Sequence, residues 1–388
     1  MTTFARGIAI AVVCLGSSAC GVTIDFATVG NPGNLANFNG WGAVPETFTI
    51  SKFETTNTQF AEFLNRVDAA GTNPNGVYTS LMGSDTIGGI TFNAATGSGS
   101  KYAVKAGAPD GSPAGTSYAT MPVAFVTWFT AARFANWLQN GQQANAASME
   151  DGTYTLANQT SGEIPARQSG AGSRVALPSR DEWYKAAFYN GAGYRLWPCT
   201  TNDTPTNTVV DLFRPCAANF GGAATPTVGP INVGSYTNSA SSYGLYDMLG
   251  NVTEYTDTGG TSADAGKAQV FGGSWATPPE DLHVWNSAAP PVFRSSSAAT
   301  SQIGFRVAVV QAVPEPSAAA VVAAGVVGLA AWRARRRRGT PPSLTRLGFL
   351  VADQTSGESG LIARAAKPWR RLRTCTYGCR QRCSVIRA

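Results

Sequence analysis

The sequence predicts an α+β fold that is rich in loops. Glycine and proline are abundant, with 43 Gly and 22 Pro among 388 residues, and both residue types favour turns. Helical patterns are few and far apart. Strand-like segments lie between them without the regular alternation of a βαβ sheet, so the pattern favours α+β over α/β.

Three helices are predicted, each with a polar residue that can cap its first turn. The first follows Thr56 or Asn57 and ends at Gly71, the second spans about 127–140, and the third starts at Ser179, three residues before a glutamate that completes a capping box. Apolar residues in the first two recur at the spacing of one helix face, namely Phe60, Phe63, Leu64 and Val67, then Trp128, Ala131, Ala135 and Leu138.

The remaining segments are interpreted as strands and loops. Residues 22–26 alternate in polarity and residues 48–50 resume a strand. Residues 70–118 predict long surface loops with one short hairpin. Residues 190–310 are Gly-rich, aromatic and strand-like, with no internal repeat.

Charge is distributed unevenly. The chain carries +6, yet residues 333–388 hold twelve more Arg and Lys than Asp and Glu, which leaves residues 1–332 at −6. An acidic body does not predict a nucleic-acid partner.

The N-terminus predicts export. Residues 1–20 combine Arg6, a short apolar stretch and small residues before a cleavage position, which is typical of a signal peptide. Cys20 follows directly and leaves a lipoprotein as the alternative. In an oxidising compartment Cys199 and Cys216 predict a disulfide, worth about 3 kcal/mol on a loop-entropy estimate; two free buried thiols are the alternative.

The C-terminal region changes composition sharply. Residues 313–338 contain Pro-Glu-Pro, an apolar run and an Arg-rich end, and this order resembles the PEP-CTERM sorting signal of Gram-negative bacteria. The resemblance implies a transmembrane segment, processing by an exosortase, and a place at the cell envelope or outside the cell. Residues 339–388 are basic and predict a disordered tail or a run-on of the gene model; a cytoplasmic tail or a zinc-binding end built on three cysteines is the alternative.

The residues available for catalysis are limited. His283 is the single histidine, so sites that need two or three histidine ligands are excluded. No nucleophile elbow, P-loop or dinucleotide fingerprint is present. We interpret His283 as an ordinary loop residue.

Several motifs follow one another in an informative order. They are Lys52–Asn57, Met121-Pro122-Val123, Leu177-Pro178-Ser179, Gly244–Tyr255, Gly272–Trp275 and Gly304-Phe305-Arg306. In this order they resemble the formylglycine-generating enzyme (sulfatase-modifying factor) family over residues 22–310. The resemblance implies a variant of the C-type lectin fold within a domain spanning 21–312.

The same resemblance identifies a departure from the family. Family enzymes oxidise a cysteine to formylglycine with copper(I) held by two cysteines, and these positions are Thr277 and Leu282 here. Neither side chain offers the soft thiolate that Cu(I) prefers, so no copper is expected. Ser274 matches a family active-site serine, and without the metal we interpret it as a turn residue.

A calcium site is also implied by the resemblance. It would use the side chains of Asp247 and Glu254 and the carbonyl groups of Gly250 and Val252, all hard oxygen ligands. The alternative is a capped turn with two solvated carboxylates.

Together these features predict an exported, noncatalytic module. It would bind extracellular polysaccharide or an envelope protein, or act structurally, and signal peptidase and exosortase would process it. The alternative is a formylglycine-generating oxidase or another enzyme that uses unrecognised ligands on the same fold.

Overall fold

A computed structural model describes residues 21–311, apart from 169–171, 208–214, 222–228 and 282–290. The described residues belong to the first of the chain's two structural units, Met1–Ala320. The predicted signal peptide, the sorting signal at 313–338 and the tail at 339–388 lie outside the described residues, as do Leu282 and His283. No helix in the described part of the chain is long and apolar enough to cross a membrane.

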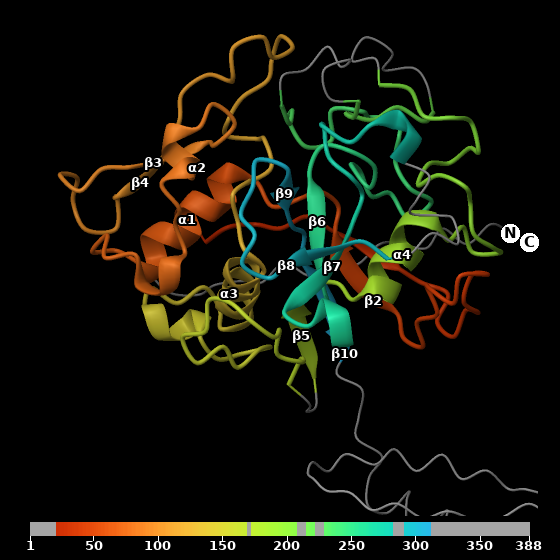
Figure 1. Ribbon diagram of the computed structural model, residues 1–388, viewed down its shortest axis with the longest axis horizontal. Helices are drawn as coiled ribbons and strands as arrows, with labels where there is room; N and C mark the ends of the chain where they lie inside the picture. Colours follow the sequence, from red (N-terminus) through yellow and green to blue (C-terminus); the bar gives the residue numbers. More distant parts are fainter. Residues whose placement is uncertain (1–20, 169–171, 208–214, 222–228, 282–290, 312–388) are drawn as a thin grey trace, which may run out of the picture. The chain divides into compact units, whose positions relative to one another are not determined.

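The first sheet joins the two ends of the domain. Its order is β1–β2–β10–β5, and every neighbouring pair is antiparallel. Ala308 stands opposite Ile50 on one side and Ala176 on the other, and Figure 1 shows β5 and β10 running side by side. The four strands span Phe26–Val29, Phe48–Ser51, Ala308–Gln311 and Ser173–Ala176.

The second sheet has the order β8–β7–β6–β9, in which only the pair β6 and β9 is parallel. These strands span Phe293–Ser295, Lys267–Phe271, Thr253–Gly259 and Ile303–Gly304. A separate hairpin joins β3 (Ile90–Phe92) to β4 (Tyr102–Val104), which confirms the hairpin expected within residues 70–118.

The three predicted helices are confirmed as α1 (Asn57–Val67), α3 (Trp128–Gln139) and α4 (Arg180–Phe188). Their N-caps are Thr56, Thr127 and Ser179, and the first and last form capping boxes. The remaining helical elements are short: α2 spans Leu81–Ser84, and the 3₁₀ turns η1, η2 and η4 span Pro74–Gly76, Ala146–Met149 and Ser262–Asp264.

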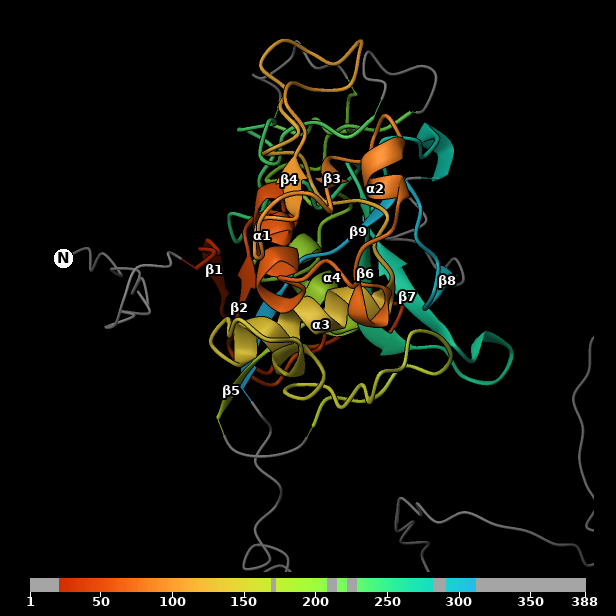
Figure 2. The ribbon, with the colours of Figure 1, turned by 90° about the vertical axis from the view of Figure 1, so that its left-hand side faces the viewer.

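The core lies where α1 and α3 pack together (Figures 1 and 2). The predicted apolar face of α1 is fully buried. Helix α3 is buried on nearly all sides, and even Arg133 and Asn136 have no exposed surface. Leu138, which we expected to face the core, packs against it but is half-buried, since it lies in the last turn of the helix.

The first strand starts later than predicted. Residues 22–25 are not part of a strand, because β2 ends at Ser51 and Ser51 pairs with Phe26. Strand hydrogen bonds require a partner, so an alternating pattern beyond the end of β2 cannot continue the sheet. The resulting architecture is α+β and loop-rich, as predicted.

Candidate functional site

The loop before β6 carries the residues predicted to bind calcium, and its backbone is tightly constrained. Asp247, Gly250 and Asn251 all have positive φ, at 57°, 76° and 61°. A Cβ on Gly250 would lie 2.1 Å from the carbonyl oxygen of Asn219. Only glycine satisfies both the left-handed backbone and this close approach.

Glu254, at the start of β6, is bound by Arg306. The Nε and Nη2 atoms of Arg306 donate to the two carboxylate oxygens of Glu254, each at 2.6 Å. The Nε1 atom of Trp183 also donates to Glu254, at 2.7 Å. Remaining guanidinium N–H groups donate to the carbonyl oxygens of Ser51, Lys52 and Tyr246. This buried pair therefore joins the end of β2, the loop before β6, and β6 itself.

Two further carboxyl groups lie beside this pair. Glu54 is buried, and it accepts hydrogen bonds from the Asn251 side chain and the Val252 amide. Burial, with the added charge of Asp247, raises the pKa of Glu54 well above its usual range. Burial likewise raises the pKa of Asp247 to about 6. Asp247 is hydrogen-bonded to Glu54, so the pair favours one shared proton over two adjacent charges.

Asp247 and Glu254 lie close enough for their charges to interact, but Glu254 has another partner. Both of its oxygens are held by Arg306. Asp247 and Glu54 offer hard oxygen donors instead, and the buried Tyr236 hydroxyl, which is close enough to feel the charge of Asp247, has no hydrogen-bond partner among the described residues; this arrangement fits a cation site beside Asp247. No three or more His, Cys, Asp or Glu side chains within the described ranges gather as a metal site. The calcium site at Asp247, Gly250, Val252 and Glu254 remains a prediction, and Glu54 is a further carboxylate beside Asp247.

The first copper position is part of a tight turn. The Thr277 hydroxyl accepts a hydrogen bond from the Ser274 amide at 2.8 Å, and the Thr277 amide donates to the Ser274 carbonyl at 2.9 Å. Ser274 is fully buried, with its hydroxyl 3.3 Å from Oε1 of Gln302. Both hydroxyls therefore take part in the turn, and the structural role of Ser274 remains a prediction.

The predicted disulfide between Cys199 and Cys216 is confirmed. Their Cα atoms are 5.5 Å apart, within the usual range for a disulfide, and both residues are buried. The bridge encloses the segment that precedes Asn219, whose backbone supports the loop before β6.

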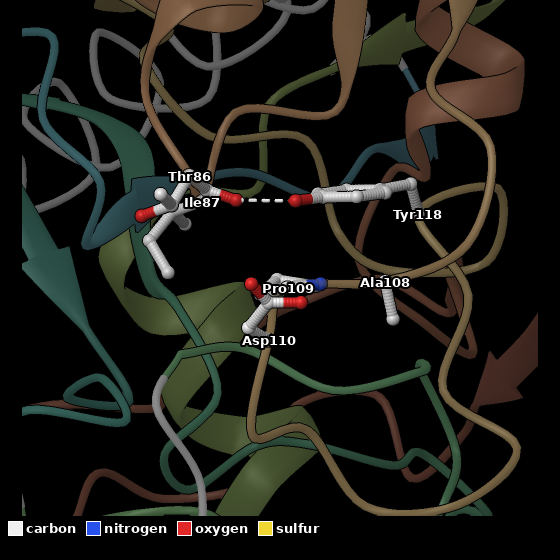
Figure 3. A pocket seen from close by; sticks show the side chains of 6 residues that line it. All are labelled: Thr86, Ile87, Ala108, Pro109, Asp110 and Tyr118. Carbon is white, nitrogen blue, oxygen red and sulfur yellow. Dashed lines mark hydrogen bonds between the residues drawn. The ribbon is translucent and has the colours of Figure 1, made fainter.

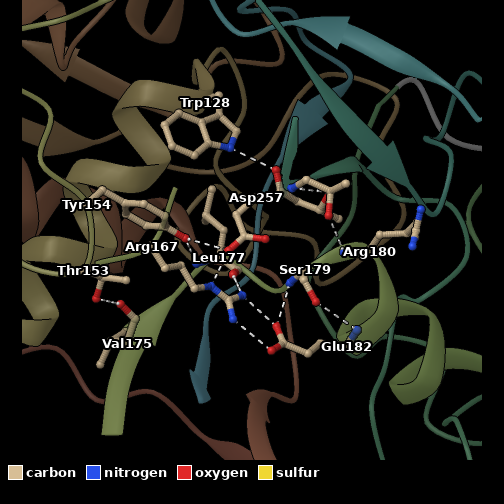
Figure 4. Close-up of polar contacts among 12 residues, drawn as sticks. Trp128, Thr153, Tyr154, Arg167, Val175, Leu177, Ser179, Arg180, Glu182 and Asp257 are labelled. Atoms are coloured by element: carbon tan, nitrogen blue, oxygen red, sulfur yellow. Dashed lines mark hydrogen bonds and ion pairs between the residues drawn. The ribbon is translucent and has the colours of Figure 1, made fainter. Parts of the chain in front are cut away.

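A second buried ion cluster was not foreseen from the sequence (Figure 4). Arg167 donates to both carboxylate oxygens of Glu182, at 2.9 and 2.7 Å, and forms an ion pair with Asp257. The Tyr154 hydroxyl donates to Asp257 at 3.3 Å and accepts from the Leu177 amide. Burial raises the pKa of Asp257 to about 6 although Arg167 opposes this shift. Every member has a partner, which indicates that the cluster anchors the loop carrying Arg167 to α4 and β6.

A small surface pocket lies apart from these clusters (Figure 3). Its lining residues are Thr86, Ile87, Ala108, Pro109, Asp110 and Tyr118. The Tyr118 hydroxyl donates to the Thr86 carbonyl at 2.5 Å, so its proton is already used in a hydrogen bond within the protein. The lining pairs no nucleophile with a base, and we assign the pocket no reaction.

The fold and these clusters define a formylglycine-generating-enzyme-like variant of the C-type lectin fold. Residues 42–311 match the sulfatase-modifying factor enzyme 1-like domain, and the chain belongs to that family. No curated protein matches the chain.

Many solved structures are similar to this chain, among them the following three. "Crystal Structure of CarF" is 19% identical, with 75% of this chain and 99% of that chain covered and a TM-score of 0.47. Treponema denticola variable protein 1 is 19% identical, covering 73% and 94%, with a TM-score of 0.44. PvdO from Pseudomonas aeruginosa is 17% identical, covering 74% and 91%, with a TM-score of 0.38. These similarities carry no inference about function.

Proposed function

We propose that this protein is a noncatalytic member of its family that acts as a binding or structural module at the cell envelope. Thr277 carries the proposal. At the position of a copper-binding cysteine it presents a hydroxyl that is already hydrogen-bonded to Ser274. Cu(I) prefers thiolate ligands, and the sequence has Leu282 at the second position.

The alternative is an enzyme that uses ligands not yet recognised. Cu(I) titration of the purified protein, and incubation with a Cys-x-Pro-x-Arg peptide, distinguish the two. We expect neither stoichiometric Cu(I) uptake nor loss of the peptide thiol. The double variant Thr277→Cys/Leu282→Cys is the matched control, because it returns both thiolates to the same scaffold and is expected to gain Cu(I) binding. Conversion of the peptide by the wild-type protein would overturn the noncatalytic proposal.

Export is part of the proposal. The signal peptide predicted at 1–20, the sorting signal predicted at 313–338 and a disulfide suited to an oxidising compartment support it. Signal peptidase and an exosortase would process the two ends in a Gram-negative bacterium. Intact-mass measurement of the native protein tests this: we expect loss of residues 1–20 and of the basic C-terminal region, and an unprocessed mass contradicts export.

Two classes of partner suit this binding role, namely an extracellular polysaccharide and an envelope protein. Calcium at Asp247 and Glu54 would then be a structural ion, since it would neutralise buried carboxylates beside the loop before β6.

A further inference from the structure

The loop before β2, residues 30–44, is held rigidly although it contains no regular structure. The side chain of Asn34 donates to the Gly42 carbonyl at 2.8 Å and to the Tyr194 hydroxyl at 2.7 Å, and it accepts from the Val44 amide at 3.3 Å. One asparagine thus closes the base of the loop and joins it to the segment containing Tyr194.

The tip of the loop is fixed to α4. The side chains of Asn37 and Asn39 both donate to the hydroxyl of Tyr184, at 2.7 and 3.1 Å. Tyr184 has no exposed surface. The Gly42 amide donates to Asp181 at 2.9 Å. Two asparagines that face the core on either side of Phe38 leave the ring between them directed outward.

These constraints display apolar side chains to solvent. Leu35 is 84% exposed, Phe38 is 71% exposed, and Leu196, two residues after Tyr194, is 59% exposed. We call Leu35, Phe38 and Leu196 the Leu–Phe patch. The Tyr194 hydroxyl donates to the Leu35 carbonyl at 3.0 Å, so both contributing segments are tied together. Exposed apolar groups on a rigid support commonly mark an interaction surface, and prior ordering reduces the entropic cost of binding.

The loop of the patch carries no charge of its own; the charged groups beside it are Arg180 and Asp181, which are paired at 3.0 Å, and Arg195, which precedes Leu196. Residues 30–44 contain no Asp, Glu, Lys or Arg and have four asparagines. Asn31, on the same loop, is exposed, and its side-chain oxygen accepts a hydrogen bond from the Tyr243 hydroxyl. A loop without charges gives no strong attraction to an anionic polymer or lipid headgroup, and the neighbouring Arg180 is already paired with Asp181.

The size of the patch also restricts its partner. Three protruding side chains cover far less than the roughly 1,600 Å² that a stable protein interface buries, which disfavours a second copy of this chain. A sugar ring fits this footprint, since its apolar C–H face can pack on Phe38 and leucine while its hydroxyl edge meets carboxamides, which both donate and accept.

We propose that the Leu–Phe patch is a binding subsite for an uncharged polysaccharide. The proposal rests on the binding role proposed above and assigns it a place. Repeated sugar units would bind successive copies of the protein along one chain of the polymer, so weak single contacts would add through multivalency.

Sedimentation of the full-length chain with insoluble glucan, mannan and xylan tests the proposal, with alginate beads as the charged arm. The variants are Phe38→Ala and Leu35→Ala/Phe38→Ala. Leu81→Ala, at a leucine on α2 that is 45% exposed, is the matched control. We expect wild type and Leu81→Ala to bind a neutral polymer equally, and the double variant to bind about tenfold more weakly. Unchanged circular dichroism and melting temperature establish that each variant is folded.

Other outcomes overturn the proposal in distinguishable ways. Equal binding of a neutral polymer by wild type and the double variant would show that the Leu–Phe patch is not the binding subsite, while the binding role itself would stand. Binding to alginate alone overturns the uncharged ligand. Capture of an envelope protein that is lost in Phe38→Ala, with no neutral polymer bound, assigns the patch to a protein partner instead. Failure to bind any polymer or protein overturns both the patch and the binding role.

Discussion

Arg306 holds both carboxylate oxygens of Glu254 at 2.6 Å, and neither side chain has any exposed surface. A buried ion pair gains little over apolar residues of similar size, but removing one member leaves a charge without a partner. Because Arg306 also binds carbonyl groups of the end of β2 and the loop before β6, the arrangement of three segments depends on this pair.

We expect Arg306→Met to lower the free energy of unfolding by about 3–5 kcal/mol, since it leaves the buried Glu254 carboxylate without a charged partner. The double variant Glu254→Met/Arg306→Met should lose less than the sum of the two single losses. Urea unfolding of the four proteins measures this coupling. Additive losses would contradict it.

The acidic pair predicts a pH dependence. Asp247 has an ordinary pKa of 3.8 and a folded pKa of about 6. Between these values the folded protein holds a proton that the unfolded chain releases, so this contribution to stability is present below pH 4 and is lost as the pH rises through about 6. The raised pKa of Glu54 acts in the same direction.

Glu54→Gln tests this sign. The neutral amide avoids burying a charge, so the variant should gain stability relative to wild type as pH rises from 4 to 7, by on the order of 1–2 kcal/mol. The control is Asp110→Asn at an exposed position, which should show no such trend. A constant difference between Glu54→Gln and wild type across the range would refute the assignment.

Calcium should compete with the shared proton. If calcium binds Asp247 and Glu54, adding millimolar CaCl₂ at pH 7 raises the melting temperature, as binding to the folded state alone requires. The gain should shrink at pH 5, where both carboxyl groups are protonated, and disappear in Asp247→Asn. Differential scanning fluorimetry with EGTA and MgCl₂ controls provides the measurement. An equal gain in Asp247→Asn places the ion elsewhere.

How far the sequence predicts this structure depends on the range of each interaction. Caps and helix faces are local, and Ser179 with Glu182 was recognisable from spacing alone. The Glu254–Arg306 pair spans 52 positions, so an isolated Glu254 looked like a free calcium ligand. The motif Gly304-Phe305-Arg306 is visible in the sequence, but the sequence does not indicate that Glu254 is the partner of Arg306.

The disulfide should contribute measurably to stability. Replacing Cys199 and Cys216 by serine opens a loop with a sequence separation of 17, for which chain entropy gives about 3 kcal/mol. The double variant should unfold at lower urea concentration, and dithiothreitol should affect wild type but not the variant. An effect of dithiothreitol on the variant would show that another thiol is responsible.

Gly250 and Gly244 provide a matched pair that separates backbone strain from steric contact. Both have positive φ, at 76° and 78°, but a Cβ on Gly244 would meet no atom within 4 Å, whereas one on Gly250 would lie 2.1 Å from a backbone oxygen of Asn219. Gly244→Ala should therefore cost only the left-handed strain, about 1 kcal/mol. Gly250→Ala must also displace backbone and should cost about 3 kcal/mol or more. Urea unfolding of both variants decides the matter, because equal losses would mean that the chain around Asn219 yields to a methyl group and does not fix the loop before β6.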